Sequence, residues 1–183
     1  MSQPRSLFAV LREAINSRDP VTGTLHQSAF ARAVENWVGG GAAARRPSSS
    51  LLLVQIDWTT RAGRTARPSR RQADVSIRQV AEITASCLRT TDVIGRTGET
   101  DVLGVLLPST PAQQAEHVSR RIRAAVSERT LKHGFPVTVS IGLSTGLSND
   151  PWVSAADALA DAQLEGGNRI VVAAGPAPTQ RRA

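Results

Sequence analysis

Two short apolar runs separated by a polar turn constrain the fold of this chain more than any other stretch. The runs are Val93–Ile94 and Val102–Leu107, and the turn contains Thr97-Gly98-Glu99-Thr100-Asp101. Aliphatic and β-branched runs on either side of a polar, glycine-containing turn are typical of a β-hairpin, here with more than two turn residues. The flanking segments must therefore build a sheet around an antiparallel strand pair.

Helical and strand patterns alternate along the rest of the chain. Apolar residues at helical spacing predict helices over Ser6–Ser17, Gln27–Val38, Ala73–Leu88, Thr110 to about Val126, and Asp150–Glu165. Besides the hairpin, strands are predicted over Leu51–Ile56, Phe135–Leu143 and Ile170–Val172. This order predicts an α+β ferredoxin-like sandwich, with a five-stranded, mainly antiparallel sheet and helices packed on it.

Several local signals mark where these elements begin and end. Thr110-Pro111-Ala112-Gln113 combines an N-cap hydroxyl, a proline at the first helical position and a glutamine three residues after the cap. Gly166-Gly167 is a typical helix stop. Leu51–Ile56 is almost continuously apolar, which predicts a central strand buried on both faces.

The length of 183 residues fits one domain with short extensions. We expect an N-terminal amphipathic linker helix over residues 1–18, a domain over 19–174 and a disordered tail rich in arginine and proline over 175–183. Within the domain, Gly39–Ser50 has the composition of a flexible linker. Arg61–Arg71 contains five arginines among Gly, Pro, Ser and Thr, and we expect a basic loop there.

The charge and the single cysteine narrow the functional classes. The formal charge is +7 and is carried mostly by arginine, which favours anionic partners such as phosphates, nucleotides or nucleic acid. A high-GC genome accounts for it equally well. Cys87 excludes an internal disulfide and is expected to be a packing residue. No apolar run is long enough to span a membrane and no signal-peptide pattern is present, so we expect a cytoplasmic location.

Six segments in collinear order resemble the GGDEF, or diguanylate cyclase, family. The resemblance extends from about Asp19 to Val172 and implies the nucleotidyl-cyclase-like version of the predicted fold. The six segments are Asp19-Pro20-Val21-Thr22-Gly23, Leu51–Asp57, Arg89-Thr90-Thr91-Asp92, Arg96-Thr97-Gly98 with Val105–Pro108, Val137–Gly142, and Gly166-Gly167-Asn168-Arg169.

The chain departs from the family wherever the family performs chemistry. Members join two GTP molecules into cyclic di-GMP, with metal ions that neutralise the developing charge. Magnesium prefers carboxylate oxygens, yet the first-strand ligand position is Gln55. The Gly-Gly-Asp/Glu-Glu-Phe signature reads Gly98-Glu99-Thr100-Asp101-Val102, with one extra residue before Pro108. The lysine and arginine that hold the triphosphate in the family correspond to Gln163 and Gly167.

The resemblance therefore implies a degenerate cyclase domain, with no catalytic residue, no metal ligand and no required cofactor. Magnesium would matter only for residual activity. Three carboxylates remain near the signature: Glu99 and Asp101, interpreted as solvated turn residues, and Asp57, interpreted as a polar residue at a strand end. The altered positions are Gln55, Gly98, Glu99, Thr100, Asp101, Val102, Gln163 and Gly167.

One family motif is retained. Arg89 and Asp92 match the RxxD pair of the inhibitory site, where family members bind cyclic di-GMP. Arginine can bridge phosphate oxygens and a guanine edge bidentately, and a carboxylate can accept hydrogen bonds from guanine. Arg121 occupies the place of the arginine that completes this site, with Arg120 and Arg123 as further candidates. Alternatively, Arg89 and Asp92 form only a surface ion pair.

Three functions remain open. The leading one is a catalytically inactive GGDEF-type domain that binds cyclic di-GMP at the retained motif and signals through a protein partner or a homodimer. The second is an active or weak diguanylate cyclase that uses Glu99 and Asp101. The third is a nucleotide-independent interaction module that docks on an acidic protein or nucleic acid. Sequence-specific DNA binding is not expected, because the sequence has no helix–turn–helix pattern.

Overall fold

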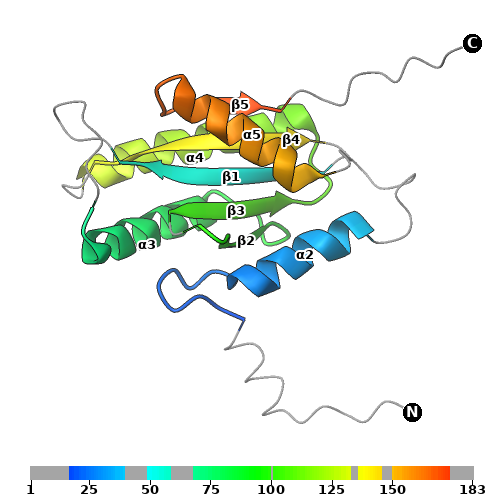
Figure 1. Cartoon of the computed structure of the whole chain (residues 1–183), viewed down its shortest axis with the longest axis horizontal. Coiled ribbons are helices and arrows are strands. Elements are labelled where there is room, and N and C mark those ends of the chain that lie inside the picture. Colours follow the sequence, from blue (N-terminus) through cyan, green and yellow to red (C-terminus); the bar gives the residue numbers. More distant parts are fainter. Residues whose placement is uncertain are drawn as a thin grey trace, which may run out of the picture.

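The structure is a computed structural model that describes residues 17–39, 49–58, 68–99, 101–132, 136–145 and 150–173 (Figure 1). The predicted N-terminal helix, the predicted linker and the C-terminal tail fall almost entirely outside these ranges, as does most of the predicted basic loop. The described residues contain a five-stranded sheet and four helices. No helix among them is long and apolar enough to cross a membrane.

The strands form one sheet in the order β2-β3-β1-β4-β5. The central strand β1 runs antiparallel to both β3 and β4, β2 pairs antiparallel with β3, and only β4 and β5 are parallel. This confirms the predicted α+β fold and its mainly antiparallel sheet. The strands are β1 (Ser50–Asp57), β2 (Val93–Arg96), β3 (Val102–Leu107), β4 (Thr138–Thr145) and β5 (Ile170–Val172).

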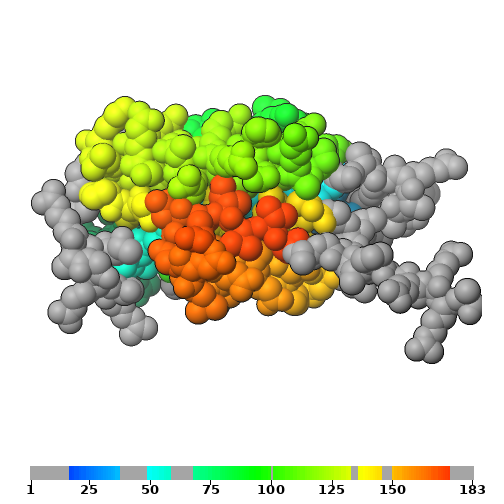
Figure 2. Space-filling view, turned by 90° about the horizontal axis from the view of Figure 1, so that it is seen from above, coloured from blue at the N-terminus to red at the C-terminus, as the bar shows by residue number. Residues whose placement is uncertain are grey.

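The helices cover both faces of the sheet. They are α2 (Gln27–Gly39), α3 (Arg70–Ser86), α4 (Ala112–Lys132) and α5 (Pro151–Leu164). Side chains of β1 alternate between the two layers, so Leu52 and Val54 pack with α3 and α4, whereas Leu53 packs with α2 and α5. Figure 2 looks onto the β5 edge and shows α4 and α5 on opposite sides of it. The buried β1 strand is confirmed.

Glycines let α2 and α5 approach the sheet closely. Gly95 and Gly104 face each other across β2 and β3, and a Cβ on Gly104 would lie 2.1 Å from the Phe30 ring. On β4, a Cβ on Gly142 would lie 2.1 Å from the Ala155 carbonyl oxygen of α5. Because these positions lack side chains, both helices sit directly on the strands. Phe30 also meets Trp152 edge to face, with ring centroids 5.7 Å apart.

The α3 helix begins earlier than the sequence pattern suggested. Arg70 and Arg71, assigned to the basic loop, form its first turn. The reason is a capping box: the Ser69 hydroxyl accepts from the Gln72 backbone N–H, and the Gln72 side chain accepts from the Ser69 backbone N–H. Cys87 caps the other end of α3 and is buried in the core, as expected.

The α4 helix also differs from the prediction at both ends. The Thr110 hydroxyl donates to the Pro108 carbonyl oxygen, and the helix begins at Ala112. It continues past Val126 to Lys132, because Thr130 is buried and its hydroxyl accepts from the Val137 N–H ahead of β4. The last turns of α4 are therefore stabilised by the segment that precedes β4.

The last strands and α5 follow the sequence more closely. Strand β4 is shifted from the predicted Phe135–Leu143 because its eight residues pair with all eight residues of β1. The Asp150 carboxylate caps α5 by accepting from the Trp152 and Val153 N–H groups. The helix stop at Gly166-Gly167 is confirmed, and both glycines have positive φ.

Candidate functional site

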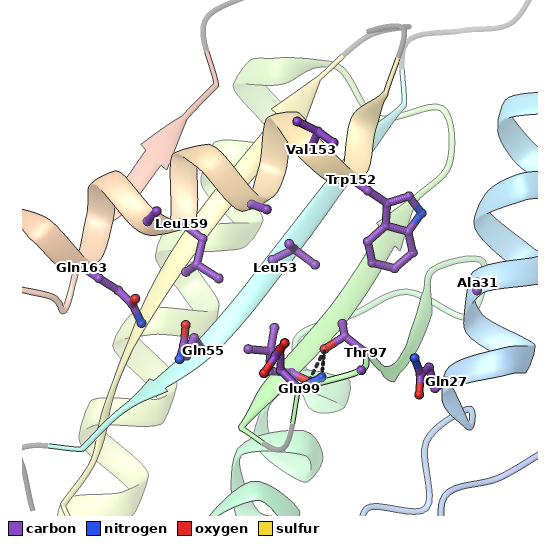
Figure 3. Close-up of a pocket in the computed structure, with 14 residues that line it drawn as sticks. Gln27, Ala31, Leu53, Gln55, Thr97, Glu99, Trp152, Val153, Leu159 and Gln163 are labelled. Atoms are coloured by element: carbon purple, nitrogen blue, oxygen red, sulfur yellow. Dashed lines mark hydrogen bonds between the residues drawn. The ribbon is translucent and has the colours of Figure 1, made fainter.

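A cavity of about 600 Å³ lies between α2 and α5, with β1 and β3 as its floor. Figure 3 shows Trp152, Leu159 and Gln163 of α5 on one side and Gln27 of α2 on the other. The tip of the β2–β3 hairpin closes one end, and we call this cavity the tip pocket. Its lining brings together five of the altered positions: Gln55, Gly98, Glu99, Val102 and Gln163.

The tip pocket carries almost no charge. Among its described lining residues, Glu99 is the sole charged side chain. The other polar side chains are the hydroxyl of Thr97 and the amides of Gln27, Gln55 and Gln163, and the rest of the lining is Ala, Leu, Val, Trp and Gly. The lining therefore offers a triphosphate no cation with which to form charge-assisted hydrogen bonds.

Asp101 is engaged by its neighbours rather than solvated. It is half-buried, and its Oδ2 atom accepts from Gln55 Nε2 at 3.3 Å and from Trp58 Nε1 at 3.1 Å. The interpretation of Asp101 as a solvated turn residue is therefore wrong: it faces N–H donors from the end of β1. The sequence offered no direct signal for the Trp58 contact, which joins residues 43 positions apart.

These residues do not fit a magnesium ion. Magnesium requires oxygen ligands, and the Asp101 oxygen faces two N–H donors. Within the described ranges, no group of three His, Cys, Asp or Glu side chains could hold a metal. Glu99 is exposed in the turn, where its backbone N–H donates to the Thr97 hydroxyl. Thr100 lies outside the described residues.

Asp57 links the end of β1 to two other elements. Its Oδ2 atom accepts from the Thr138 hydroxyl at 2.8 Å and from the Asn168 N–H at 2.9 Å, and its Oδ1 atom accepts from the Ser140 hydroxyl at 2.6 Å. Gly167 approaches the same carboxylate, since a Cβ there would lie 3.3 Å from Asp57 Cγ. Asp57 thus holds β4 and the α5–β5 loop in place, a role that the sequence analysis missed.

The base of the hairpin has a different arrangement. The turn after α3 is closed by Asp92, whose Oδ2 atom accepts from the Arg89 backbone N–H at 2.8 Å. No ion pair joins the two side chains, and within the described part of the chain the exposed Arg89 guanidinium makes no hydrogen bond or ion pair. The alternative of a simple Arg89–Asp92 surface ion pair is therefore not what the structure shows.

Arg121 lies at the same end of α3. It projects from α4, is exposed, and donates to the carbonyl oxygen of Cys87, two residues before Arg89. Arg120 instead pairs with Glu116 one turn earlier on α4, and Arg123 donates to the backbone and side-chain oxygens of Asn168. The structure thus groups Arg89, Asp92 and Arg121, which we call the Arg89 site, and directs the other two arginines elsewhere.

Asp92 also borders a second cavity, of about 400 Å³. This cavity lies between α3, β2 and the turn that precedes α2, and Arg18 and Glu82 line it as well. The Arg89 site is thus next to a hollow that contains both signs of charge.

Comparison with known proteins gives one consistent family. The model described as "Diguanylate cyclase, GGDEF domain" matches residues 17–169. Diguanylate cyclase A of Treponema denticola is 30% identical over 136 residues, which cover 70% of this chain and 36% of that protein. The chain therefore spans about a third of the length of this relative.

Comparison with solved structures finds the same fold in proteins that are described as diguanylate cyclases or GGDEF domains. The diguanylate cyclase SiaD of Pseudomonas aeruginosa, in complex with its activator SiaC, superposes with a TM-score of 0.75 at 26% identity, covering 91% of this chain and 65% of SiaD. The coiled coil and GGDEF domain of Caulobacter crescentus DgcB, in complex with c-di-GMP, gives 0.73 at 22% identity and covers 91% and 90%. The FimX GGDEF domain of P. aeruginosa gives 0.71 at 22% identity and covers 84% and 98%. With the family match over most of its length, this chain belongs to the diguanylate cyclase GGDEF-domain family.

Proposed function

We propose that this GGDEF domain is catalytically inactive and serves as a cytoplasmic receptor for cyclic di-GMP, which binds at Arg89, Asp92 and Arg121. One observation carries the proposal: within the described residues the exposed Arg89 guanidinium makes no hydrogen bond or ion pair, whereas the Asp101 carboxylate at the hairpin tip already accepts two hydrogen bonds. Two structural neighbours, both of DgcB from Caulobacter crescentus, were solved in complex with c-di-GMP and are consistent with such a ligand.

The chemistry of the Arg89 site suits a guanine dinucleotide. The planar Arg89 fork can take two phosphate or guanine oxygens at once, and Arg121 adds a second fork from α4. Asp92 uses Oδ2 for the Arg89 backbone N–H, which leaves Oδ1 to accept from guanine N–H groups. The backbone contact also fixes the spacing between the arginine and the carboxylate.

The tip pocket supports the inactive half of the proposal. Phosphoryl transfer depends on cations that neutralise the charge developing on the phosphate. Gln163 lines the pocket without a charge, and Gly167 has no side chain with which to reach a phosphate. At the first-strand metal position and at the two triphosphate positions, the chain thus has two amides and a glycine, Gln55, Gln163 and Gly167, none of which carries a charge.

Calorimetric titration with cyclic di-GMP tests the proposal. We expect wild type to bind and Arg89→Ala to lose affinity by about tenfold or more, since a hydrogen bond to a charged group contributes about 1.5–3 kcal/mol. Arg120→Ala is the matched control, because Arg120 pairs with Glu116 on the same helix as Arg121. Equal affinity of wild type and Arg89→Ala would reject the site, and no heat at all would favour a nucleotide-independent interaction module.

A weak cyclase is the second candidate, because Glu99 is exposed at the pocket and a diguanylate cyclase is 30% identical. Incubation of the pure protein with GTP and magnesium, followed by chromatography, separates the two. We expect no cyclic di-GMP to form. Product that disappears in Glu99→Gln would establish the cyclase instead. Signalling to a protein partner is part of our proposal, and the complex of SiaD with its activator SiaC gives a structural precedent.

A further inference from the structure

The cavity between α3, β2 and the turn over residues 18–25, which we call the side cavity, has walls that hydrogen bonds hold in place. The turn is tied to α3, because Arg78 Nε donates to the Val21 carbonyl oxygen at 2.9 Å, and to β2, because the Leu25 N–H donates to the Ile94 carbonyl oxygen at 3.1 Å. Its volume of about 400 Å³ lies within the range of small-molecule pockets, about 300–1,000 Å³. The side cavity is therefore preformed and of a size that ligands occupy.

The side cavity combines apolar walls with charged groups. On α3, Glu82 lines it, and among the described residues no hydrogen bond or ion pair engages the Glu82 carboxylate. On the turn, Arg18 donates to the Gly23 carbonyl oxygen at 2.7 Å, which uses one of the five N–H groups of a guanidinium and lets the others face a ligand. The apolar lining comes from Leu25, Ala81, Ala85, Val93 and Ile94. A flat heteroaromatic base matches such a lining, because its faces are apolar and its edges carry donors and acceptors.

Asp92 connects the side cavity to the Arg89 site. Its Oδ2 atom accepts from the Arg89 backbone N–H at 2.8 Å, and the same residue lines the cavity. In a cyclic dinucleotide each base is separated from a phosphate by a single sugar. A dinucleotide whose phosphates contact Arg89 and Arg121 would therefore place one base next to the side cavity.

The charge of Glu82 selects between the two purines. A carboxylate only accepts hydrogen bonds. Guanine presents two adjacent donors on its Watson–Crick edge, N1–H and N2–H, whereas adenine has an acceptor at N1. On the other edge of guanine, O6 and N7 both accept, and an arginine can donate to the two atoms at once. Glu82 and Arg18 thus offer what guanine requires on its two edges.

We propose that one guanine of cyclic di-GMP binds in the side cavity, where Glu82 accepts from N1–H and N2–H and Arg18 donates to O6 and N7. The other guanine remains available to Asp92. This inference rests on the proposed function of the Arg89 site and adds the residue that distinguishes guanine from adenine. It also makes the ligand a bridge, because Glu82 belongs to α3 and Arg18 to the turn.

Calorimetric titration with cyclic di-GMP and with its adenine counterpart, cyclic di-AMP, tests the role of Glu82. We expect Glu82→Gln to bind cyclic di-GMP about tenfold more weakly than wild type, because an amide N–H then faces the guanine donors. The same variant should bind cyclic di-AMP more tightly, since an amide matches the donor and the acceptor of adenine. A carboxylate that acts only through its charge gives a different result, because its removal strengthens the binding of both anionic ligands. Stronger binding of both would overturn the proposal.

Two further variants complete the test. Glu35→Gln makes the same change of charge at an exposed position of α2 outside the side cavity, and it should bind both ligands as wild type does. Ala85→Leu places a larger side chain in the cavity and should weaken cyclic di-GMP binding by about tenfold. Thermal unfolding checks that each variant is folded.

The outcomes separate this inference from the function on which it rests. Wild-type affinity in both Glu82→Gln and Ala85→Leu, together with a loss in Arg89→Ala, would overturn the guanine site in the side cavity and leave the proposed function intact. A wild-type protein that binds no cyclic di-GMP would reject the proposed function, and this inference with it.

Discussion

The two ends of the β2–β3 hairpin differ in whether their charged side chains already have hydrogen-bond partners in the protein. At the tip, the Asp101 carboxylate accepts from Gln55 and Trp58, and the described lining of the tip pocket contains no cation. At the base, the Arg89 guanidinium is exposed and has no partner among the described residues, and Arg121 lies beside the same helix end. A group that already has a protein partner must break that contact to bind a ligand, whereas an exposed charge loses only water. This difference supports our proposal that the hairpin is a scaffold at its tip and a recognition element at its base.

The largest expected effect tests whether the carboxylates near the tip are structural. Asp57→Ala should lower the free energy of unfolding by about 3 kcal/mol, because three donors lose a half-buried charged acceptor. Urea denaturation measures the change. Asp161→Ala, an exposed position on α5, serves as the control and should stay within about 0.5 kcal/mol of wild type. Equal stability of the two variants would refute a structural role.

The next prediction asks whether Arg89, at the base of the hairpin, contributes to ligand binding or to the stability of the fold. Arg89→Ala should weaken cyclic di-GMP binding by about 2 kcal/mol and change the free energy of unfolding by less than about 0.5 kcal/mol, because the guanidinium is exposed. Calorimetry and urea denaturation of the same preparation give both values. If stability fell as much as affinity, Arg89 would be a structural residue and the contrast with the tip would disappear.

A third change tests directly whether the hydrogen bonds to the Asp101 carboxylate stabilise the fold. Gln55→Glu replaces a hydrogen-bond donor 3.3 Å from the Asp101 carboxylate by a second negative charge. We expect a loss of about 1–2 kcal/mol at neutral pH, which shrinks at acidic pH as one carboxyl becomes protonated. Magnesium should restore part of the loss by pairing with both carboxylates.

The control for this change is Gln163→Glu, an exposed glutamine of the same pocket, which should leave stability unchanged and insensitive to magnesium. Thermal unfolding of both variants, with and without magnesium, is the measurement. A Gln55→Glu protein as stable as wild type at neutral pH would show that the tip carboxylate is free to take other partners.

The smallest expected effect is that of removing Arg120, an exposed arginine outside the Arg89 site. Arg120→Ala removes an exposed i,i+4 pair with Glu116 and should change the free energy of unfolding by about 0.5 kcal/mol or less, with no change in cyclic di-GMP affinity. A tenfold loss of affinity in this variant would extend the Arg89 site along α4.

The fold was predictable because its signals are local and agree with one another. The alternating hydrophobic runs, the glycine stop after α5 and the N-cap at Asp150 each specify one element, and their order specifies the sheet. The errors fall at element ends. The Ser69–Gln72 capping box extended α3 into an arginine-rich segment, and the Thr130–Val137 contact extended α4.

The site was predictable only in part. Residue types alone predicted that the tip lacks charged ligands for metal and triphosphate, since Gln55 and Gln163 carry no charge. They also indicated Arg89 and Asp92 as candidate ligand-binding residues. The contacts of Asp101 with Trp58 and of Asp57 with Ser140 join distant positions, 43 and 83 residues apart. Such pairings depend on strand register: Asp57 lies opposite Thr138, and Ser140 shares the face of Thr138. Hydrophobic patterns do not specify which polar groups meet.

One measurement tests the contrast between tip and base most directly: amide NMR titration of the same protein with cyclic di-GMP and, separately, with GTP and magnesium. We expect cyclic di-GMP to shift the amide signals of Arg89, Asp92 and Arg121, and GTP to leave the signals of Trp152, Leu159 and Gln163 in the tip pocket unchanged. Shifts at the tip pocket with GTP and none at Arg89 with cyclic di-GMP would contradict both expectations.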